Sequence, residues 1–310
     1  MARRVTPAQR LARLSADEIV AALKLTRAPA AVRGLVRAGF TAVSSPLGRT
    51  LARFDAAIAS QGLARAAALA LEDLGACWAP VGQAPFSKGP LLVVANHPGA
   101  YDALVLFAAI GRDDVAVLAS DREFLRAMPN LRRHLLLVPE SMAGPARARA
   151  LGLRRAIAHL EAGGSILHFG SGAIEPDPAF PLAEGGARLL PWQAGTGSLV
   201  RATRRASGWV VAALVEGVHS RLAKEHFVNR LAERRGVTTL APLLQMAFTR
   251  YRDVSATVRF GAAVRAREFA AAGDDAAVTA RVREHALALR PTLDSQEDLS
   301  ERRSRIVPAG

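Results

Sequence analysis

Cysteine is almost absent from this sequence, since Cys77 is the only one among 310 residues. A single cysteine excludes an internal disulfide framework and any zinc or iron–sulfur site that needs several thiolates. Long apolar stretches are also missing, because the longest, such as residues 103–110 and 209–215, fall well short of the ~20 residues of a membrane-spanning helix. No unbroken apolar stretch of the kind that marks a cleaved signal peptide occurs near the N-terminus. We therefore expect a protein that folds by packing alone and does not cross a membrane.

Lysine is scarce as well, so almost all of the 41 basic residues are arginines, and the net charge is +14. Hydrophobic residues make up 50% of the chain, which excludes a disordered protein. The first 60 residues contain ten basic and three acidic residues, half of the whole excess. Nucleic acid could attract such a surface, but only Phe40 and Phe54 are aromatic there and no nucleic-acid-binding module is recognisable. We expect no nucleic-acid partner and favour an anionic membrane surface, although the apolar stripes of this region could equally pack against the rest of the protein.

Hydrophobic periodicity predicts an α/β fold with a mixed, largely parallel sheet flanked by helices, preceded by an all-helical N-terminal region. Four helices are expected before residue 76, the first beginning at the capping-box pattern Ser15–Glu18. Short apolar runs typical of buried strands follow, with helical segments between them. The expected strands are 91–95, 115–119, 135–138, 165–169, 209–215 and 254–260, and the expected helices are 145–162, 195–206, 239–249 and 276–289. The predicted regions are 1–76 (basic, helical), 77–290 (α/β) and 291–310 (a polar tail).

The loop after the first of these strands carries the strongest chemical signal. Ligand sites of open α/β sheets lie in loops at the carboxyl ends of strands. His97 leaves the strand there, and Asp102 stands where the next helix should begin. A carboxylate on one imidazole nitrogen fixes the tautomer and stabilises the imidazolium, so the other nitrogen can act as a general base. Alternatively, Asp102 only caps its helix and His97 is a turn residue bonded to backbone.

The segment Asn96-His97, four residues, then Asp102 resembles the signature of the glycerolipid acyltransferase superfamily, the family of lysophosphatidic acid acyltransferases. The resemblance runs in order from about Val81 to Gly261. A second family block, Phe-Pro-Glu-Gly-Thr-Arg, has a partial counterpart at residues 169–174. Phe169 and Gly172 correspond, whereas Gly170, Ser171 and Ile174 replace proline, glutamate and arginine. Glu175 follows, as in the Phe-Pro-Ala-Gly-x-Ile-Glu-Pro variant of some bacterial members; a plain strand-to-helix loop is the alternative interpretation.

Two further blocks are weaker. The strand 210–215 followed by Glu216-Gly217 is similar to the family's third block, although any buried strand with a turn glycine would look the same. The family places a phosphate-binding arginine after the strand 135–138, where this chain has Glu140 and its neighbours. The missing arginine argues against glycerol-3-phosphate or lysophosphatidate as acceptor.

The resemblance implies the glycerolipid acyltransferase fold and an O-acyltransferase that moves a fatty acyl group from acyl-CoA or acyl-ACP to a hydroxyl of a lipid acceptor. His97 and Asp102 would be catalytic, and no metal or bound cofactor is expected. The expected substrate-binding residues are Asn96, Gly99, Gly170, Ser171, Gly172, Glu175 and Arg201. Arg201 could meet the phosphates of coenzyme A or acidic carrier protein, or simply lie on a solvated helix face. A cytoplasmic location at the inner face of the cytoplasmic membrane is expected, and the alternative is a catalytically inactive lipid-binding or membrane-surface protein on the same fold.

Overall fold

The structure, a computed structural model, describes residues 5–22, 29–82, 88–139, 146–180, 189–234 and 240–290. Eight strands in these ranges form one sheet. They are β1 (Cys77–Val81), β2 (Leu91–Ala95), β3 (Val115–Ser120), β4 (Leu135–Val138), β5 (Ser165–Phe169), β6 (Trp209–Glu216), β7 (Ser255–Phe260) and β8 (Val264–Arg265). The helices before β5 are α1 (Pro7–Ala22), α2 (Ala30–Val43), α3 (Ser45–Gln61), α4 (Leu63–Asp73), α5 (Asp102–Ile110), α6 (Glu123–Arg126) and α7 (Ala146–Glu161). Those after β5 are α8 (Gly195–Arg205), α9 (Arg221–Glu225), α10 (Phe227–Arg234), α11 (Ala241–Ala247), α12 (Ala266–Ala270) and α13 (Asp275–Leu287).

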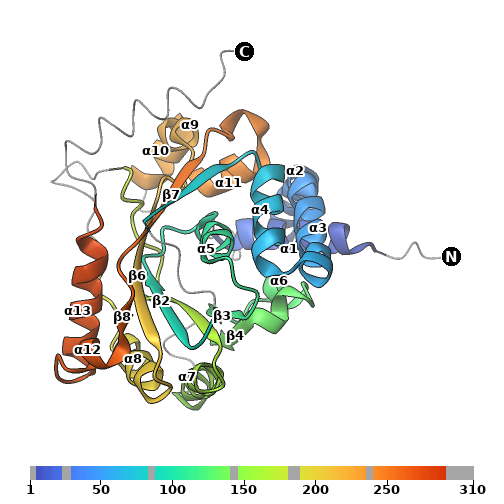
Figure 1. Cartoon of the computed structure of the whole chain (residues 1–310). Helices are drawn as coiled ribbons and strands as arrows, with labels where there is room; N and C mark the ends of the chain where they lie inside the picture. Colours follow the sequence, from blue (N-terminus) through green and yellow to red (C-terminus); the bar gives the residue numbers. More distant parts are fainter. Residues whose placement is uncertain are drawn as a thin grey trace.

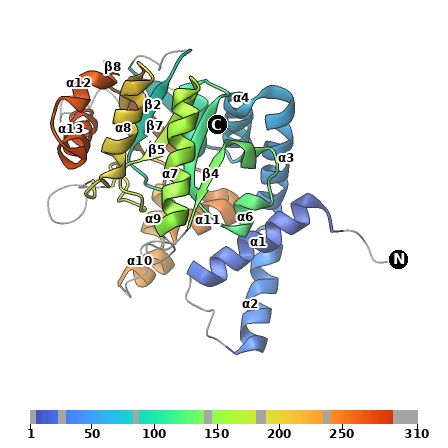
Figure 2. The same cartoon turned by 90° about the horizontal axis from the view of Figure 1, so that it is seen from below.

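The strand order is β1-β7-β6-β2-β5-β3-β4, and β8 pairs with β6. Pairs from β6 through β2, β5 and β3 to β4 are parallel, whereas β7 and β8 run antiparallel to β6. The predicted mixed, largely parallel sheet is therefore confirmed. Helices cover both faces, with α3, α4 and α5 on one side and α7, α8, α12 and α13 on the other (Figures 1 and 2).

The central strand, β2, shows why continuous apolar runs, without alternation of apolar and polar residues, predicted strands correctly. In β2, Val93 and Ala95 belong to the core beneath α4 and α5, while Leu92 and Val94 belong to the core beneath α7 and α8. All five residues of β2 are buried, since both faces of the strand are covered. The six predicted strands are present, with ends within one residue of the expected positions.

The N-terminal helices share the core of the sheet. Phe54 and Ile58 of α3 are buried in the same cluster as Val93, and Leu47 and Leu51 pack against it. The apolar stripe of α3 therefore faces inward, which decides between the two interpretations for this stripe. Only the arginines beside this stripe are therefore left as candidates for contact with an anionic membrane.

The expected start of the first helix was wrong. Helix α1 begins at Pro7, and the hydroxyl of Ser15 donates to the carbonyl of Leu11 inside it at 2.9 Å. The capping box lies upstream, because the Gln9 amide donates to Thr6 Oγ1 at 3.2 Å and the Thr6 amide to Gln9 Oε1 at 2.9 Å. Pro7 at the first helical position strengthens that start, since its fixed φ suits a helix.

Two other parts of the fold were missed. Strand β1 contains Pro80 and exposed residues, because it is an edge strand paired only with β7, and so it lacks an apolar run. The short helices α9 and α10 were not anticipated either. The expected helix 239–249 is shorter, as α11, and is followed by a 3-10 turn (Thr249–Tyr251). The expected polar tail 291–310 and Glu140 lie outside the described residues.

Candidate active site

Three loops meet at one edge of the sheet. Ala95, the last residue of β2, is in register with Phe169 of β5 on one side and Ala213 of β6 on the other. Because these strands are parallel, the segments that follow them leave the sheet together. The first and second blocks recognised in the sequence are therefore neighbours in space, and the third is close to both.

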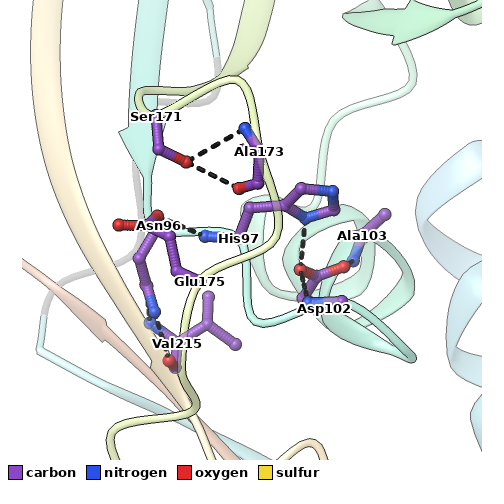
Figure 3. Close-up of polar contacts among 9 residues, drawn as sticks. Asn96, His97, Asp102, Ala103, Ser171, Ala173, Glu175 and Val215 are labelled. Atoms are coloured by element: carbon purple, nitrogen blue, oxygen red, sulfur yellow. Dashed lines mark hydrogen bonds and ion pairs between the residues drawn. The ribbon is translucent and has the colours of Figure 1, made fainter. Parts of the chain in front are cut away.

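His97 and Asp102 are in direct contact in the loop between β2 and α5. His97 Nδ1 lies 2.7 Å from Asp102 Oδ2 (Figure 3). The carboxylate is 3% exposed and the imidazole 29% exposed. A buried acid thus holds a histidine whose ring remains open to a substrate.

The loop backbone fixes the position of this acid. Asp102 Oδ2 also accepts the Gly99 amide at 2.7 Å, and Oδ1 accepts the Ala103 amide at 2.6 Å. The turn needs positive φ at Gly99 (85°) and Ala100 (56°), and glycine adopts such a φ without strain. The N-cap position of α5 is Tyr101, and no side-chain hydrogen bond caps the helix. Asp102, the first residue of α5, instead binds the neighbouring Gly99 and Ala103 amides and holds the histidine as well.

The surroundings raise the pKa of His97. Burial alone would lower the pKa, since it disfavours the charged ring, but the charge and hydrogen bond of Asp102 and the charge of Glu175 outweigh burial. The site is therefore suited to carry a proton on His97, which a general base must do in the transition state.

An aromatic ring supports the imidazole from the neighbouring strand. Phe169, at the end of β5, stacks on His97 with centroids 4.1 Å apart and an interplanar angle of 28°. The sequence comparison matched Phe169 to the second block but gave it no task. Its place at the end of the expected strand 165–169 was the available signal.

Glu175 supports the same loop from below the imidazole rather than facing a substrate. Its Oε2 accepts the His97 amide at 2.9 Å, its Oε1 accepts the Leu190 amide at 2.8 Å, and its own amide donates to the His97 carbonyl at 2.7 Å. The residue is 2% exposed, and burial raises the pKa of its carboxyl against these hydrogen bonds. We expected Glu175 to bind substrate, whereas in the structure its oxygens position the His97 backbone.

Asn96 also differs from the expected substrate-binding role. Its side chain is fully buried and exchanges two hydrogen bonds with the backbone of Val215 in β6, at 2.8 and 2.7 Å. This pairing ties the start of the site loop to the third block. Asn96 therefore anchors the start of the His97 loop to β6.

The glycine-rich loop after β5 uses its amides internally. The Gly170 amide donates to the Ala95 carbonyl at 3.0 Å, and the Gly172 amide donates to the Phe169 carbonyl at 3.1 Å. The Ser171 hydroxyl donates to the Ala173 carbonyl at 2.7 Å. The amides of Gly170 and Gly172 are therefore bonded within the protein.

Packing explains why glycine occupies position 170. A Cβ atom there would lie 2.2 Å from the ring of Trp192. Gly172 has a φ of 65°, which favours glycine for conformational reasons. These residues shape the loop beside His97, and their proposed contact with a substrate remains a prediction.

Arg201 lies apart from this cluster. Its Nε donates to Asp275 at 2.7 Å, and the guanidinium also binds the Gly273 carbonyl, so it links α8 to the start of α13. None of its described partners belongs to the His97 loop. Its expected role in substrate binding is not supported by these contacts, which instead fit a structural link between two helices.

Within the described ranges, no group of three or more histidine, cysteine, aspartate or glutamate side chains is arranged to hold a metal ion. Among the described helices, none combines the length and apolarity needed to span a bilayer.

Comparison with known proteins gives similarities to solved structures only. No family model and no curated protein matches the chain. The chain is similar in structure to the 1-acyl-sn-glycerophosphate (LPA) acyltransferase PlsC from Thermotoga maritima, with a TM-score of 0.48 and 16% sequence identity. The match covers 79% of this chain and 80% of that chain. A similarity this low in TM-score and identity assigns neither a reaction nor a substrate.

Proposed function

We propose that the protein is an acyltransferase that moves a fatty acyl group from a thioester donor to a hydroxyl of a lipid acceptor. The observation that carries the proposal is the 2.7 Å contact between a partly exposed imidazole and a buried carboxylate at the carboxyl ends of the parallel strands. The resemblance of residues 96–102 to the glycerolipid acyltransferase signature supports it. The donor is acyl-CoA or acyl-ACP.

In the proposed reaction, His97 acts as the general base. Asp102 accepts a hydrogen bond from the Nδ1–H group, so Nε2 on the other side of the ring carries the lone pair. Nε2 takes the proton of the acceptor hydroxyl while its oxygen forms a bond to the thioester carbonyl carbon. The tetrahedral intermediate then breaks its carbon–sulfur bond, and the leaving thiolate takes the proton back from His97. Asp102 stabilises the imidazolium in between, and neither a metal nor a bound organic cofactor is required.

The acceptor is proposed to be a lipid without a terminal phosphate at the reacting end. Ile174 occupies the place of the arginine in the second family block, and it is 55% exposed. Its side chain lies 3.5 Å from where a Cβ on Gly99 would stand, beside the loop of His97. An isoleucine there offers no charge-assisted hydrogen bond to a phosphomonoester.

A lipid acceptor places the enzyme at a membrane surface, and we propose peripheral association with the inner face of the cytoplasmic membrane. Basic residues in the first 60 positions would contribute about 1 kcal/mol each near an anionic surface. Arg37 and Arg53 are partly neutralised by Asp17 at 2.6 Å and Asp73 at 2.7 Å. Exposed arginines such as Arg13 and Arg49 remain for this role.

Acceptor-dependent thiol release tests the proposal. The purified chain is incubated with palmitoyl-CoA or palmitoyl-ACP and a bacterial lipid extract, and free thiol and acylated lipid are measured together. We expect thiol release that rises with added lipid and a new acyl lipid of matching mass. A folded chain that releases no thiol above background from either donor would contradict the proposal and favour the inactive lipid-binding alternative.

A further inference from the structure

The segment after β6 presents large apolar side chains to solvent. Leu222 of α9, Phe227 and Leu231 of α10, and Phe248 after α11 are 51%, 70%, 45% and 43% exposed. Phe227 and Leu231 are four residues apart and so lie on the same face of α10. These four side chains form what we call the α10 patch. The buried residues beneath it are small or few, since the local cluster consists of Ala223, Ala241 and Tyr251.

Basic side chains surround the patch. Arg221 and Arg230 are exposed on α9 and α10, and the Arg250 guanidinium lies 5.7 Å from the Phe248 ring centroid. Residues 221–231 and 248–253 together contain five basic and two acidic residues. Arginines beside exposed apolar groups are typical of interfacial helices, where the apolar face enters the acyl boundary and the cations meet lipid phosphates.

The α10 patch also belongs to the same edge of the molecule as His97. It follows the carboxyl end of β6, which is parallel to β2 and therefore ends beside the His97 loop. Gln245 of α11 accepts the Ser220 amide at 2.9 Å and donates to the Val218 carbonyl at 2.9 Å. Gln245 also shares a side-chain hydrogen bond with Tyr101, the residue before Asp102. The helices of the patch are thus attached to the proposed catalytic loop.

Helix α10, which carries Phe227 and Leu231, projects from the same side of the molecule as α2 (Figure 2). In Figure 2, α10 and the basic helix α2 project beyond the body of the molecule in the same direction, with the body between and above them. Asn229 fixes α10 in that orientation, because its side chain is fully buried and accepts the amides of Leu240 and Ala241 at 2.7 and 3.0 Å. These bonds attach α10 to the start of α11.

We propose that the α10 patch docks on an anionic phospholipid bilayer, with Phe227 and Leu231 inserted at the acyl boundary. The apolar side chains account for insertion, and the surrounding arginines select anionic headgroups over neutral ones. This inference rests on the proposed membrane association and adds a specific surface to it, distinct from residues 1–60. Docking here turns the edge that carries His97 toward the lipid.

Vesicle binding tests the proposal with the full chain. Vesicles of equal parts phosphatidylglycerol and phosphatidylcholine are cosedimented at low salt with the wild type, the double variant Phe227→Ser and Leu231→Ser, and the control Leu151→Ser. Leu151 is 42% exposed on α7, so it matches Leu231 in type and exposure. We expect about tenfold weaker partitioning for the double variant, since two inserted side chains are lost, and no change for the control. Circular dichroism confirms that both variants are folded.

A second variant reports insertion directly. In Phe227→Trp, the added fluorescence should be quenched by lipids brominated in their acyl chains, whereas in Leu151→Trp it should not. Vesicle binding that persists without quenching of Trp at position 227 would overturn the α10 patch while leaving membrane association through residues 1–60 intact. No binding by the wild type would overturn both. A double variant that binds vesicles normally but loses self-association or carrier-protein binding would assign the patch to that protein contact and overturn the proposal.

Discussion

The loops that follow β2 and β5 lie side by side, yet their polar residues have opposite environments. In the β2 loop, the His97 side chain is 29% exposed and its carboxylate partner is buried behind it. In the β5 loop, Ser171 and Glu175 are buried and bonded to backbone, while the apolar Ile174 is exposed. The β2 loop therefore exposes a titratable side chain, whereas the β5 loop exposes an apolar side chain and buries its polar ones.

This difference assigns separate tasks to the two loops. Glu175 and Phe169 hold the backbone and ring of His97 from the β5 side, whereas Asp102 sets its charge from the β2 side. Glu175, the glutamate that follows the glycine-rich loop, therefore positions His97 in this chain. The variants below test that division, beginning with the largest expected loss of activity.

Replacing His97 should have the largest effect. His97→Ala removes the proposed base, and loss of a positioned base typically costs ~10²- to 10⁴-fold in rate. The fold should persist, because the side chain is partly exposed. Thiol release is measured against His159→Ala, a control whose ring bonds to Asp114 at the opposite edge of the sheet at 2.8 Å. Equal activity in the two variants would remove His97 from the mechanism.

Asp102→Asn should impair turnover next, by about 10²-fold, because an amide neither fixes the required tautomer nor balances the imidazolium charge. The change keeps the size of the residue. It also removes one of the oxygens that accept the Gly99 and Ala103 amides. Steady-state kinetics should therefore show the loss mainly in kcat. A variant with wild-type kcat would show that the His97–Asp102 contact serves only the structure of the loop.

Glu175→Gln should affect stability more than chemistry. One carboxylate oxygen becomes an NH₂ group facing a backbone N–H, so a buried hydrogen bond is lost at a cost of about 1–3 kcal/mol. Thermal unfolding should show a lower Tm than that of Glu161→Gln, whose carboxylate makes an exposed ion pair with Arg205. Activity should fall by less than about tenfold at temperatures where the protein is folded. A loss as large as that of His97→Ala, without a change in Tm, would mean that Glu175 takes part in the chemistry.

Ile174→Arg should have the smallest effect and should favour one acceptor class. The new guanidinium beside Gly99 can form charge-assisted hydrogen bonds with a phosphomonoester, so KM for lysophosphatidate should fall by a few-fold. Leu151→Arg provides the same charge far from the loop and should leave KM unchanged. Saturable acylation of lysophosphatidate by the wild type at low micromolar concentration would contradict the proposed acceptor preference.

Strands buried on both faces were the part of the fold most accessible from the sequence. An apolar run such as 91–95 has few alternatives, and β2 matches it residue for residue. Edge strand β1 gave no such signal, because one of its sides has no partner strand and exposed residues do not form an apolar run. The start of α1 was misplaced because Thr6-Pro7-Ala8-Gln9 and Ser15–Glu18 both fit the capping-box pattern, and only tertiary packing distinguishes them.

In the candidate site, too, only contacts that are local in the sequence could be predicted. The spacing of His97 and Asp102 is local, so their contact could be predicted from a strand, a turn and a helix start. Glu175 binds the His97 amide across 78 positions of sequence, and Asn96 binds Val215 across 119. Such contacts depend on which strands are neighbours. The family resemblance suggested substrate binding for both, and their burial was visible only in three dimensions.

The pH dependence of kcat/KM in the wild type and in Asp102→Asn tests the central claim most directly. A general base works only when unprotonated, so the rate should rise with pH through the pKa of His97, at a midpoint above the ordinary value of 6.5. Burial would lower that pKa, and the charge and hydrogen bond of Asp102 raise it. Removing the charge should therefore move the midpoint to lower pH while reducing the plateau rate. An unchanged midpoint in Asp102→Asn, or a rate that does not rise through this region, would contradict a His97–Asp102 general base.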